Sequence, residues 1–291
     1  MPELPEVEVT RQRLAPFFVG RTIARVETTR DSYFFLTKPH KLKQRLVGRR
    51  VRDLVRHGKY LLAELDDGSR LLLHLGMTGQ LFSSGVASVR LLSAKKRQAL
   101  KAAEQLAFEP DRHTHLRLYF RDGAPAVLFR DVRKFGKCRL LEPGEDDARL
   151  DKLGVDALLA SGGTLLSAAR SRAIPIKSLL LEQGVIAGIG NIYADEALFL
   201  AHVRPTRRAA RVSAAECDAI VAAVKKVMRR SIATGGSSIS DYVQPDGSDG
   251  GYQNERHVYA RGGEPCPRCG TAIRRVVIAT RSSHYCPSCQ T

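Results

Sequence analysis

Four cysteines close to the end of the sequence have the spacing of a metal site. Cys266 and Cys269 form one Cys-x-x-Cys pair, Cys286 and Cys289 form a second, and residues 270–285 separate the two pairs. Two thiolate pairs at this spacing can close a tetrahedral site across a hairpin. Because four thiolates leave no open coordination position, the pattern predicts one zinc ion with a structural role, whose binding would supply most of the folding energy of this module.

The charge of the chain indicates a polyanionic partner. It has 47 Lys and Arg against 30 Asp and Glu, which gives a formal net charge of +17 and an isoelectric point of about 10.0. Each phosphate that Lys or Arg neutralises releases condensed counterions, which favours nucleic acid. An anionic membrane surface is the weaker alternative, because the sequence has no obvious basic amphipathic helix with aromatic anchors.

The first residues could supply a nucleophile and an acid. Once Met1 is removed, Pro2 carries a secondary amine that can attack a sugar C1′ carbon and form a cationic imine. Glu3 is adjacent, and a partly buried carboxylate with a raised pKa is suited to protonating an opening deoxyribose. Glu6 is expected to position its neighbours. Both glutamates also stand where acids stabilise a helix N-terminus, an interpretation that is compatible with catalysis.

A glycine turn followed by basic residues is a candidate phosphate site. Gly188 and Gly190 precede Asn191, which we expect to be the N-cap of a helix. The amides of such a turn, with a helix N-terminus behind them, can hold a phosphate. Gly-x-Gly also marks close helix packing, but a basic run beside the turn favours phosphate binding. That run consists of Arg204, Arg207, Arg208 and Arg211.

The N-terminal half must position the candidate nucleophile. Apolar residues recur at helical spacing from Pro5 to Phe18, and Pro5 suits a first helical turn. A basic, helix-forming stretch at 93–108 predicts an inserted surface helix. Short runs of β-branched or alternating apolar residues predict a β-sandwich or barrel. These runs are residues 22–29, 50–56, 60–65, 70–75, 115–121 and 125–131.

The rest of the chain is predicted to be mainly helical. An acidic linker at 142–151 predicts a boundary near residue 150. Ser213 and Glu216 form a capping-box pattern at the start of the last helix. Residues 234–251 are rich in Gly, Ser and Asp, which predicts a mobile, functional loop. The expected helices cover residues 164–170, 175–186, 191–200 and 213–233.

The chain is therefore predicted to be an α+β multidomain protein. Residues 1–150 would form a β-sandwich domain with an N-terminal helix. Residues 151–235 would form a helical domain, and residues 236–291 a loop followed by a β-hairpin zinc finger.

Several motifs resemble those of the bacterial formamidopyrimidine-DNA glycosylase family, in the family's order. Leu4, where the related endonuclease VIII branch usually has glycine, favours the purine-directed branch. The resemblance implies a β-sandwich, a helix-two-turn-helix domain and a zinc finger. The matching segments are residues 2–8 (PELPEVE), 57–61 (HGKYL), 74–79 (HLGMTG), 133–136 (RKFG) and 188–196, together with the four cysteines.

The resemblance also implies an activity in base-excision repair. The enzyme would excise oxidised purines, 8-oxoguanine and formamidopyrimidines, from damaged double-stranded DNA. It would act as both glycosylase and abasic-site lyase, through an imine on its N-terminal proline followed by β,δ-elimination.

Single residues receive roles by the same resemblance. Lys59 would reach the phosphate or base of the damaged nucleotide, Asn191 and Arg281 would grip flanking phosphates, and Lys177 would contact DNA nearby. His74 lies in a matching motif and is counted with the DNA-binding residues. The implied catalytic set is Pro2, Glu3, Glu6, Lys59 and Arg281.

A base inside a duplex is out of reach, so the nucleotide must be extruded and the hole refilled. Met77, Arg133 and Phe135 match the residues that fill this hole in the family. Their chemistry suits the task, since they offer a flexible thioether, a guanidinium that can hydrogen-bond the orphaned cytosine, and an aromatic wedge. The loop from Ser237 to Tyr252 would cap the flipped base.

Two features depart from the family: the long insertion at 93–108, and the apolar run from Tyr33 to Leu36. Two other functions remain open. One is a glycosylase for oxidised pyrimidines, against which Leu4 and the Arg133 and Phe135 pair argue. The other is a non-catalytic zinc-containing DNA-binding protein, against which the intact Pro2, Glu3 and Lys59 argue.

The surroundings of the protein can also be predicted. No apolar run approaches the length of a membrane span, and the acidic start is unlike a signal peptide. We expect a soluble monomer of the bacterial cytoplasm that joins the nucleoid when it binds DNA.

Overall fold

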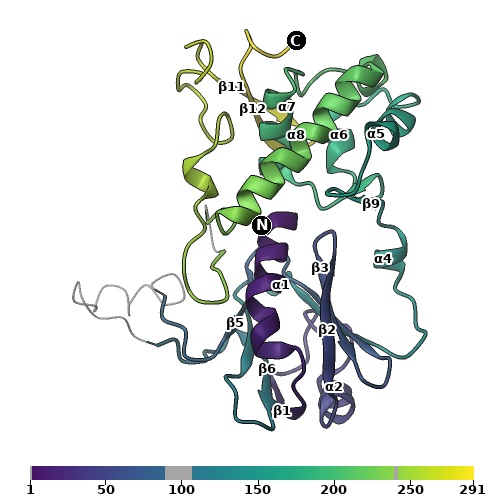
Figure 1. Ribbon diagram of the computed structural model, residues 1–291, viewed down its shortest axis with the longest axis vertical. Helices are drawn as coiled ribbons and strands as arrows, with labels where there is room; N and C mark the ends of the chain where they lie inside the picture. Colours follow the sequence, from purple (N-terminus) through teal and green to yellow (C-terminus); the bar gives the residue numbers. More distant parts are fainter. Residues whose placement is uncertain (1, 89–106, 239–241) are drawn as a thin grey trace, which may run out of the picture. The chain divides into compact units, whose positions relative to one another are not determined.

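The computed structural model describes residues 2–88, 107–238 and 242–291 (Figure 1). By their contacts these residues form two compact units. The first runs to Asp147 and takes in Thr234–Gly251, and the second consists of Ala148–Ala233 and Tyr252–Thr291. The sequence division at residues 150 and 235 stays a prediction about domains, but by its contacts Thr234–Gly251 is part of the first unit.

Two antiparallel sheets build the first unit. Among the described residues, one four-stranded sheet has the order β1-β6-β7-β5 and the other the order β2-β3-β4-β8. The predicted β-sandwich is therefore confirmed. The strands are β1 (Ile23–Thr28), β2 (Val51–His57), β3 (Tyr60–Leu65), β4 (Arg70–His74), β5 (Gly79–Ser83), β6 (Thr114–Phe120), β7 (Val127–Asp131) and β8 (Lys137–Leu141), with helices α1 (Leu4–Phe18) and α2 (Pro39–Leu46).

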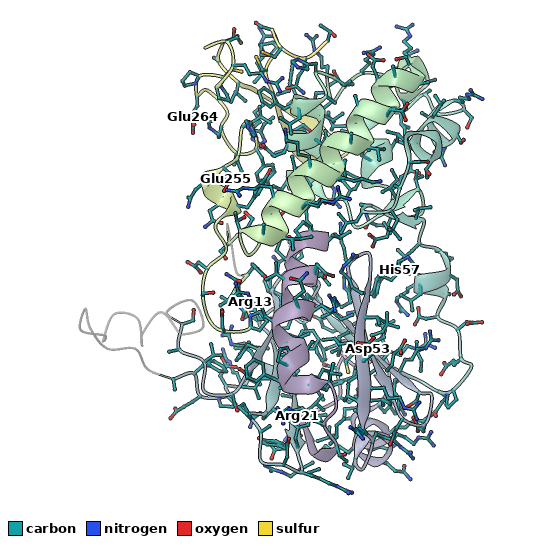
Figure 2. The ribbon with its side chains drawn as sticks, in the orientation of Figure 1. Arg13, Arg21, Asp53, His57, Glu255 and Glu264 are labelled. Atoms are coloured by element: carbon teal, nitrogen blue, oxygen red, sulfur yellow. The ribbon has the colours of Figure 1, made fainter. Side chains whose placement is uncertain are left out.

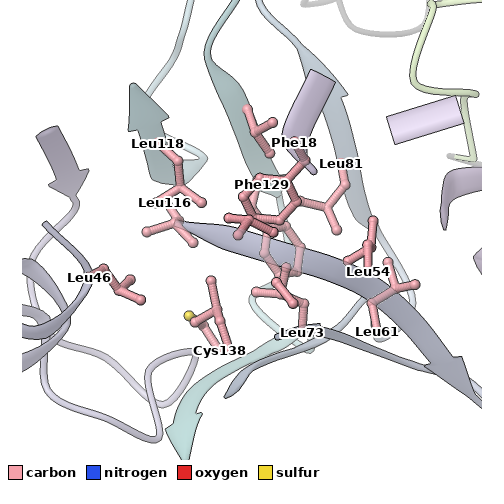
Figure 3. Packing of buried hydrophobic residues seen from close by; sticks show 14 of the residues in the cluster. Phe18, Leu46, Leu54, Leu61, Leu73, Leu81, Leu116, Leu118, Phe129 and Cys138 are labelled. Carbon is pink, nitrogen blue, oxygen red and sulfur yellow. The ribbon is translucent and has the colours of Figure 1, made fainter. Parts of the chain in front are cut away.

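Buried side chains from both sheets fill the sandwich. Figure 3 shows Phe129 of β7 near Leu73 of β4 and Cys138 of β8, all of which have almost no exposed surface. Each fully buried side chain of this size contributes about 1.5–3 kcal/mol to folding. Phe18, in the last turn of α1, belongs to the same cluster. The core therefore anchors the helix that carries the N-terminus.

The helix α1 starts as the sequence predicts. Glu3 is its N-cap, Pro5 lies in its first turn, and the main-chain amide of Glu3 donates to Oε2 of Glu6 at 2.9 Å. The Glu3 side chain accepts in return from the amide of Glu6, which completes a capping box. This exchange fixes the backbone directly after Pro2.

Two strands of the first unit, β5 and β8, were absent from the sequence prediction. All five residues of β5 are buried, including the polar Gln80 and Ser83, so burial does not alternate along the strand. The outer face of its sheet is covered by a second cluster that contains Phe82, Phe108 and Val243. The predicted helix at 93–108 lies outside the described residues except at its end, where Ala107 forms a β-bridge with Ala87.

The second unit contains helices, a short parallel strand pair and a hairpin. The helix α7 packs against α6, α8 and β12. None of the helices in the described ranges is long and apolar enough to cross a bilayer. The elements are α4 (Ala148–Asp151), β9 (Val155–Asp156), α5 (Gly162–Ala169), α6 (Ile176–Leu181), β10 (Ile186–Ala187), α7 (Asn191–Leu200), α8 (Ala214–Ala233), β11 (Arg274–Ile278) and β12 (Arg281–Tyr285), with 3-10 turns at Ala209–Arg211 and Tyr252–Asn254.

The predicted capping box of α8 is present. The amide of Ser213 donates to Oε2 of Glu216 at 2.8 Å, and the amide of Glu216 donates back to Oγ of Ser213 at 3.3 Å. The predicted N-cap of α7 was wrong. Gly190 is the N-cap of that helix and Asn191 is its first residue. The side chain of Asn191 donates a hydrogen bond to the carbonyl of Ser282.

Candidate active site and nucleic-acid interface

The buried carboxylate of Glu6 joins the start of the chain to a distant segment of the first unit. Its Oε2 accepts the amide of Glu3, and its Oε1 accepts the amide of Ser237 at 2.9 Å. Pro2, Glu3 and Glu6 are all buried. The contacts of Glu6 are those of a residue that positions its neighbours, and they hold Ser237 beside the N-terminal turn.

Lys59 lies in the turn between β2 and β3, after Gly58, whose φ is 55°. Only 8% of Lys59 is exposed. Arg56, at the end of β2, donates to Glu8 of α1 at 2.8 Å and to the carbonyl of Gly58 at 3.2 Å. One arginine therefore links the turn of Lys59 to the helix that begins beside Pro2.

The link depends on an ionised Glu8. Burial raises the pKa of Glu8, but hydrogen bonds from Arg11, Arg56 and Gln12 outweigh this effect and hold the pKa below its usual value. Glu8 is therefore an anion at neutral pH, and its interaction with Arg56 is a charge-assisted hydrogen bond.

A row of polar side chains crosses one end of the sheet that carries Lys59. His57 (Figure 2) pairs with Tyr60, Tyr60 pairs with His74, and His74 pairs with Lys137 on β8. The rings of Tyr60 and His74 have centroids 4.6 Å apart. Residues paired across strands share a face of the sheet. His74 is thus held next to the residue that follows Lys59.

Met77, Arg133 and Phe135 lie on two loops of the first unit. Met77 is 40% exposed and Phe135 is 42% exposed, although both are apolar. The Arg133 guanidinium lies 4.5 Å from the centroid of the Phe135 ring. Composition alone would favour core positions for Met77 and Phe135, but their exposure leaves these side chains available to a partner.

The two loops touch at Gly76. A Cβ atom on this residue would lie 2.4 Å from the carbonyl carbon of Phe135, and its φ of 62° is a conformation that side chains disfavour. Glycine is therefore the residue that allows the loop of Met77 to approach the loop of Phe135.

Asp131 holds both loops, and the sequence prediction missed it. Its buried carboxylate accepts hydrogen bonds from the Thr78 hydroxyl, from the amide of Arg133 at 3.2 Å and from the amide of Gly136 at 2.7 Å. The sequence signal for this role was an aspartate at the end of a predicted strand, two residues before Arg133. An aspartate at that position is equally compatible with an ordinary strand end.

A buried histidine supports Asp131 from the neighbouring strand. Nε2 of His115 lies 2.9 Å from the Asp131 carbonyl oxygen, and Nδ1 lies 2.9 Å from the Thr29 hydroxyl. Because a carbonyl only accepts, Nε2 carries the proton and Nδ1 accepts from Thr29. Burial lowers the pKa of His115, so the ring is neutral in this arrangement.

The segment expected to cap the flipped base is described at Ser237 and Ser238 and again from Tyr242 onward, whereas residues 239–241 lie outside the described part. Tyr242 and Gln244 are buried, and Val243 belongs to the cluster on the outer face of the sheet of β5. Arg13 of α1 (Figure 2) forms an ion pair with Asp246. This stretch is anchored to the first unit at several points.

In the second unit, two side chains that are expected to bind DNA donate hydrogen bonds to the same carbonyl oxygen. The carbonyl of Ser282 accepts Nδ2 of Asn191 at 2.9 Å and Nζ of Lys177 at 3.0 Å. Lys177 is fully buried, 2.7 Å from the carboxylate of Asp195. These contacts give Lys177 the role of orienting the hairpin, and its direct contact with DNA stays a prediction.

Arg281 is the first residue of β12 and is exposed. It follows Ala279 and Thr280, which both have positive φ values, 45° and 65°. Two consecutive residues of this kind form the tight turn that suits a two-residue hairpin loop. Arg281 therefore stands beside the tip of the hairpin.

Two adjacent acids of α7 hold the segments around the hairpin, and sequence reasoning missed both. Asp195 accepts the amide of His284 at 2.9 Å. Glu196 accepts the amides of three successive residues, 257–259. Burial raises the pKa of Glu196, but its hydrogen bonds with His257 and these amides outweigh that effect and lower the pKa.

The four C-terminal cysteines meet as predicted. Their Sγ atoms all lie within 4.8 Å of one another, with Cys269 3.5 Å from Cys286 and Cys266 3.9 Å from Cys289. A tetrahedral zinc–thiolate site has sulfur–sulfur edges of about 3.8 Å. The cysteines form a zinc-finger site consistent with one structural zinc ion.

Three families match successive parts of the chain. Residues 1–138 match the formamidopyrimidine-DNA glycosylase N-terminal domain, and residues 153–243 match the formamidopyrimidine-DNA glycosylase H2TH domain. Residues 263–291 match the zinc finger found in FPG and IleRS.

Full-length relatives agree with these matches. The chain is 40% identical over 299 residues to the formamidopyrimidine-DNA glycosylase of Paracoccus denitrificans, and 41% identical over 304 residues to that of Brucella ovis. In both comparisons the match covers 100% of each protein.

Solved structures show the same fold. The crystal structure of MutM (Fpg) from Thermus thermophilus is 36% identical, with a TM-score of 0.82, and the match covers 99% of this chain and 98% of that one. A MutM complex with DNA containing carbocyclic 8-oxo-G is 33% identical, with a TM-score of 0.84 and 100% of both chains covered. The Lactococcus lactis Fpg bound to abasic-site DNA is 32% identical, with a TM-score of 0.83 and 99% of both chains covered.

Proposed function

Because the chain belongs to the formamidopyrimidine-DNA glycosylase family, we propose that it is a DNA glycosylase and abasic-site lyase that removes oxidised purines such as 8-oxoguanine from damaged double-stranded DNA. The observation that carries this proposal is the buried N-terminal cluster. There Glu6 holds the amide of Glu3, next to Pro2, and the amide of Ser237. The MutM complex with DNA containing carbocyclic 8-oxo-G supports the substrate class.

The proposed reaction starts at the Pro2 nitrogen. With Met1 removed, this amine attacks C1′ of the damaged nucleotide, and the bond from C1′ to the base breaks. Glu3 gives a proton to the sugar ring oxygen as the ring opens, which leaves a cationic imine. Loss of a C2′ proton expels the 3′ phosphate, and a second elimination expels the 5′ phosphate. Hydrolysis of the imine frees Pro2 and leaves a one-nucleotide gap.

Other residues hold the substrate in this proposal. Lys59 contacts the damaged nucleotide, and His74 contacts DNA beside it. Asn191 and Arg281 grip phosphates that flank the lesion. The hydrogen bond from Asn191 to Ser282, directly after Arg281, supports a joint action of these two residues.

Met77, Arg133 and Phe135 fill the space that the extruded nucleotide leaves. Their support is the exposure of Met77 and Phe135 and the stacking of Arg133 on Phe135. The aromatic ring enters the stack as a wedge, and the guanidinium hydrogen-bonds the orphaned cytosine. The segment from Ser237 to Tyr252 caps the flipped base.

We further propose that the protein acts as a monomer on chromosomal DNA in a bacterial cytoplasm. The bacterial origin of the Paracoccus and Brucella relatives supports this setting. The net charge of +17 supports direct binding to DNA.

The test is covalent trapping. Protein whose loss of Met1 has been verified by intact mass is incubated with an 8-oxoguanine:cytosine duplex and sodium borohydride, which reduces the imine to a stable amine. The expected result is a covalent protein–DNA band that requires the lesion and that Pro2→Gly weakens, because glycine supplies a primary amine in place of the secondary amine of proline. Tight binding to damaged DNA without a band would indicate the non-catalytic DNA-binding protein.

A thymine glycol duplex serves as the second substrate. This arm is included because the Lactococcus lactis Fpg, 32% identical to this chain, has been crystallised with DNA containing an oxidised pyrimidine. Faster trapping on the pyrimidine duplex than on the 8-oxoguanine duplex would overturn the purine preference and leave the imine mechanism in place.

A further inference from the structure

Tyr33 is an exposed aromatic residue whose hydroxyl reaches the loop of Arg133. The residue is 59% exposed, and its hydroxyl donates to the Arg133 carbonyl at 2.6 Å. It belongs to the apolar run that departs from the family, and the function proposed above gives it no task. An exposed ring contributes little to the core, so its defined hydrogen bond is the feature that needs an explanation.

The hydrogen bond from Tyr33 completes the restraint of Arg133. On the amide side, Arg133 donates to Thr78 and to Asp131, at 3.2 Å in both cases. On the carbonyl side, the Tyr33 hydroxyl is the partner that the described residues provide. The next residue, Lys134, has a φ of 59°, which costs free energy in a residue with a side chain. Contacts on both sides of Arg133 hold the backbone in this turn.

Tyr33 also stands at the end of the row of polar side chains. Nζ of Lys137 lies 4.9 Å from the centroid of the Tyr33 ring, and Lys137 pairs with His74 across the sheet. His74 pairs in turn with Tyr60, directly after Lys59. The row therefore runs from the Lys59 turn to Tyr33, and from Tyr33 to Arg133 through one hydrogen bond.

We propose that Tyr33 is a positioning residue for Arg133 and that it sets how strictly the enzyme distinguishes the base opposite the lesion. The inference rests on the proposed function, in which Arg133 reads the orphaned cytosine. Recognition by a guanidinium depends on the direction of its N–H groups. If the carbonyl of Arg133 loses this hydrogen bond, the backbone at Arg133 is less restrained and its guanidinium is oriented less precisely toward the cytosine. The chemistry at Pro2 does not change.

The experiment measures single-turnover excision of 8-oxoguanine opposite cytosine and opposite adenine. Tyr33→Phe keeps the ring and removes only the hydroxyl. The matched control is Tyr119→Phe, because the Tyr119 hydroxyl also donates a hydrogen bond, to Glu27 at 3.1 Å, and Arg25 lies over its ring at 3.8 Å. These contacts of Tyr119 do not involve the loop of Arg133.

We expect Tyr33→Phe to lower the cytosine-to-adenine ratio of excision rates by about three- to tenfold, the effect of one hydrogen bond. The melting temperature should match that of Tyr119→Phe, which should keep the wild-type ratio. An unchanged ratio in Tyr33→Phe, or an equal loss on both duplexes, would overturn the inference and leave the proposed function standing. Wild-type protein that excises 8-oxoguanine from neither duplex would overturn the proposed function and the inference with it.

Discussion

Thr78 donates a hydrogen bond to the buried carboxylate of Asp131, and this contact joins the two loops on which Met77, Arg133 and Phe135 lie. The second oxygen of the same carboxylate accepts the amide of Gly136. A single side chain thus sets the spacing of the three residues proposed to fill the space beside the lesion.

Asp131→Asn keeps the size of this side chain and replaces one acceptor oxygen with an NH₂ group. We expect the free energy of unfolding to fall by about 1–3 kcal/mol, because a donor then faces a donor in a buried site. Excision of 8-oxoguanine should slow more than cleavage of a preformed abasic site, because an abasic site has no base that must be extruded. Urea unfolding and the two rates check this, and equal slowing of both rates would count against the loop-spacing role.

Gly76→Ala should be more harmful than the same change at Gly85. Both glycines have positive φ, 62° and 86°, so both substitutions carry the cost of that conformation. Only Gly76 is crowded, because a Cβ there would meet the backbone of Phe135, while a Cβ at Gly85 meets nothing within 4 Å. We expect Gly76→Ala to slow excision at least tenfold and Gly85→Ala to leave excision near the wild-type rate. Similar rates for the two variants would show that the close approach of the loops is unimportant.

Glu6→Gln should slow the imine chemistry. The glutamine offers one acceptor oxygen to the two amides of Glu3 and Ser237, so one buried amide loses its partner at a cost of about 1–3 kcal/mol. We expect borohydride trapping to slow at least tenfold while affinity for undamaged DNA is kept. The trapping rate and a binding titration measure the two effects. Trapping at the wild-type rate would exclude the positioning role of Glu6.

The stability of the protein should fall below neutral pH, in part through His115. Burial lowers its pKa from the ordinary value of 6.5, so the unfolded chain binds a proton before the folded protein does as the pH falls. The contribution of His115 is therefore present above pH 6.5 and is lost as the pH falls through the folded pKa. Urea unfolding between about pH 7.5 and pH 5 should show this loss.

His115→Gln should flatten that part of the pH profile, while a change at the exposed residue His40, such as His40→Gln, should leave it intact. A profile that His115→Gln does not alter would assign the pH dependence to other groups.

Cys266→Ser should weaken both folding and DNA binding. The loss of one thiolate opens a site whose metal binding is worth about 10–16 kcal/mol in zinc-finger peptides. Cys217→Ser is the control, because Cys217 is buried in α8, away from the four-cysteine cluster. Zinc content, circular dichroism and DNA affinity should all fall in the first variant and hold in the second. Unchanged folding and DNA binding in Cys266→Ser would refute the structural role of the metal.

Much of the architecture could be predicted from local patterns. The zinc site follows from the spacing of four cysteines, and the helix from Asn191 to Leu200 follows from apolar periodicity. Such patterns do not identify a strand that is buried on both faces. The strand β5 is buried throughout although Gln80 and Ser83 are polar, and so its sequence shows neither an apolar run nor the alternation of a half-exposed strand.

The positioning residues of the site were harder to find for a different reason. Asp131 accepts a hydrogen bond from Thr78, which lies 53 residues away in the sequence, and Glu196 accepts one from Val258, which lies 62 residues away. Neither partner can be recognised from the residues next to these acids in the sequence. Tyr33 donates its hydrogen bond to Arg133, which lies 100 residues away in the sequence. Lys177 was expected at the DNA because of the resemblance, but its ion pair with Asp195 depends on the packing of α6 against α7.

The hydrogen bond that the Ser282 carbonyl accepts limits which segments can be exchanged between related proteins. This carbonyl belongs to the zinc hairpin, yet it accepts the buried ammonium of Lys177 from the helical segment. The apolar cluster of Phe199, Val258 and Ile273 spans the same two segments. A chimera that exchanged only one of them would leave a buried cation short of an acceptor and an apolar face uncovered. Residues 148–233 and 252–291 should therefore be exchanged together in a chimera, or both be kept.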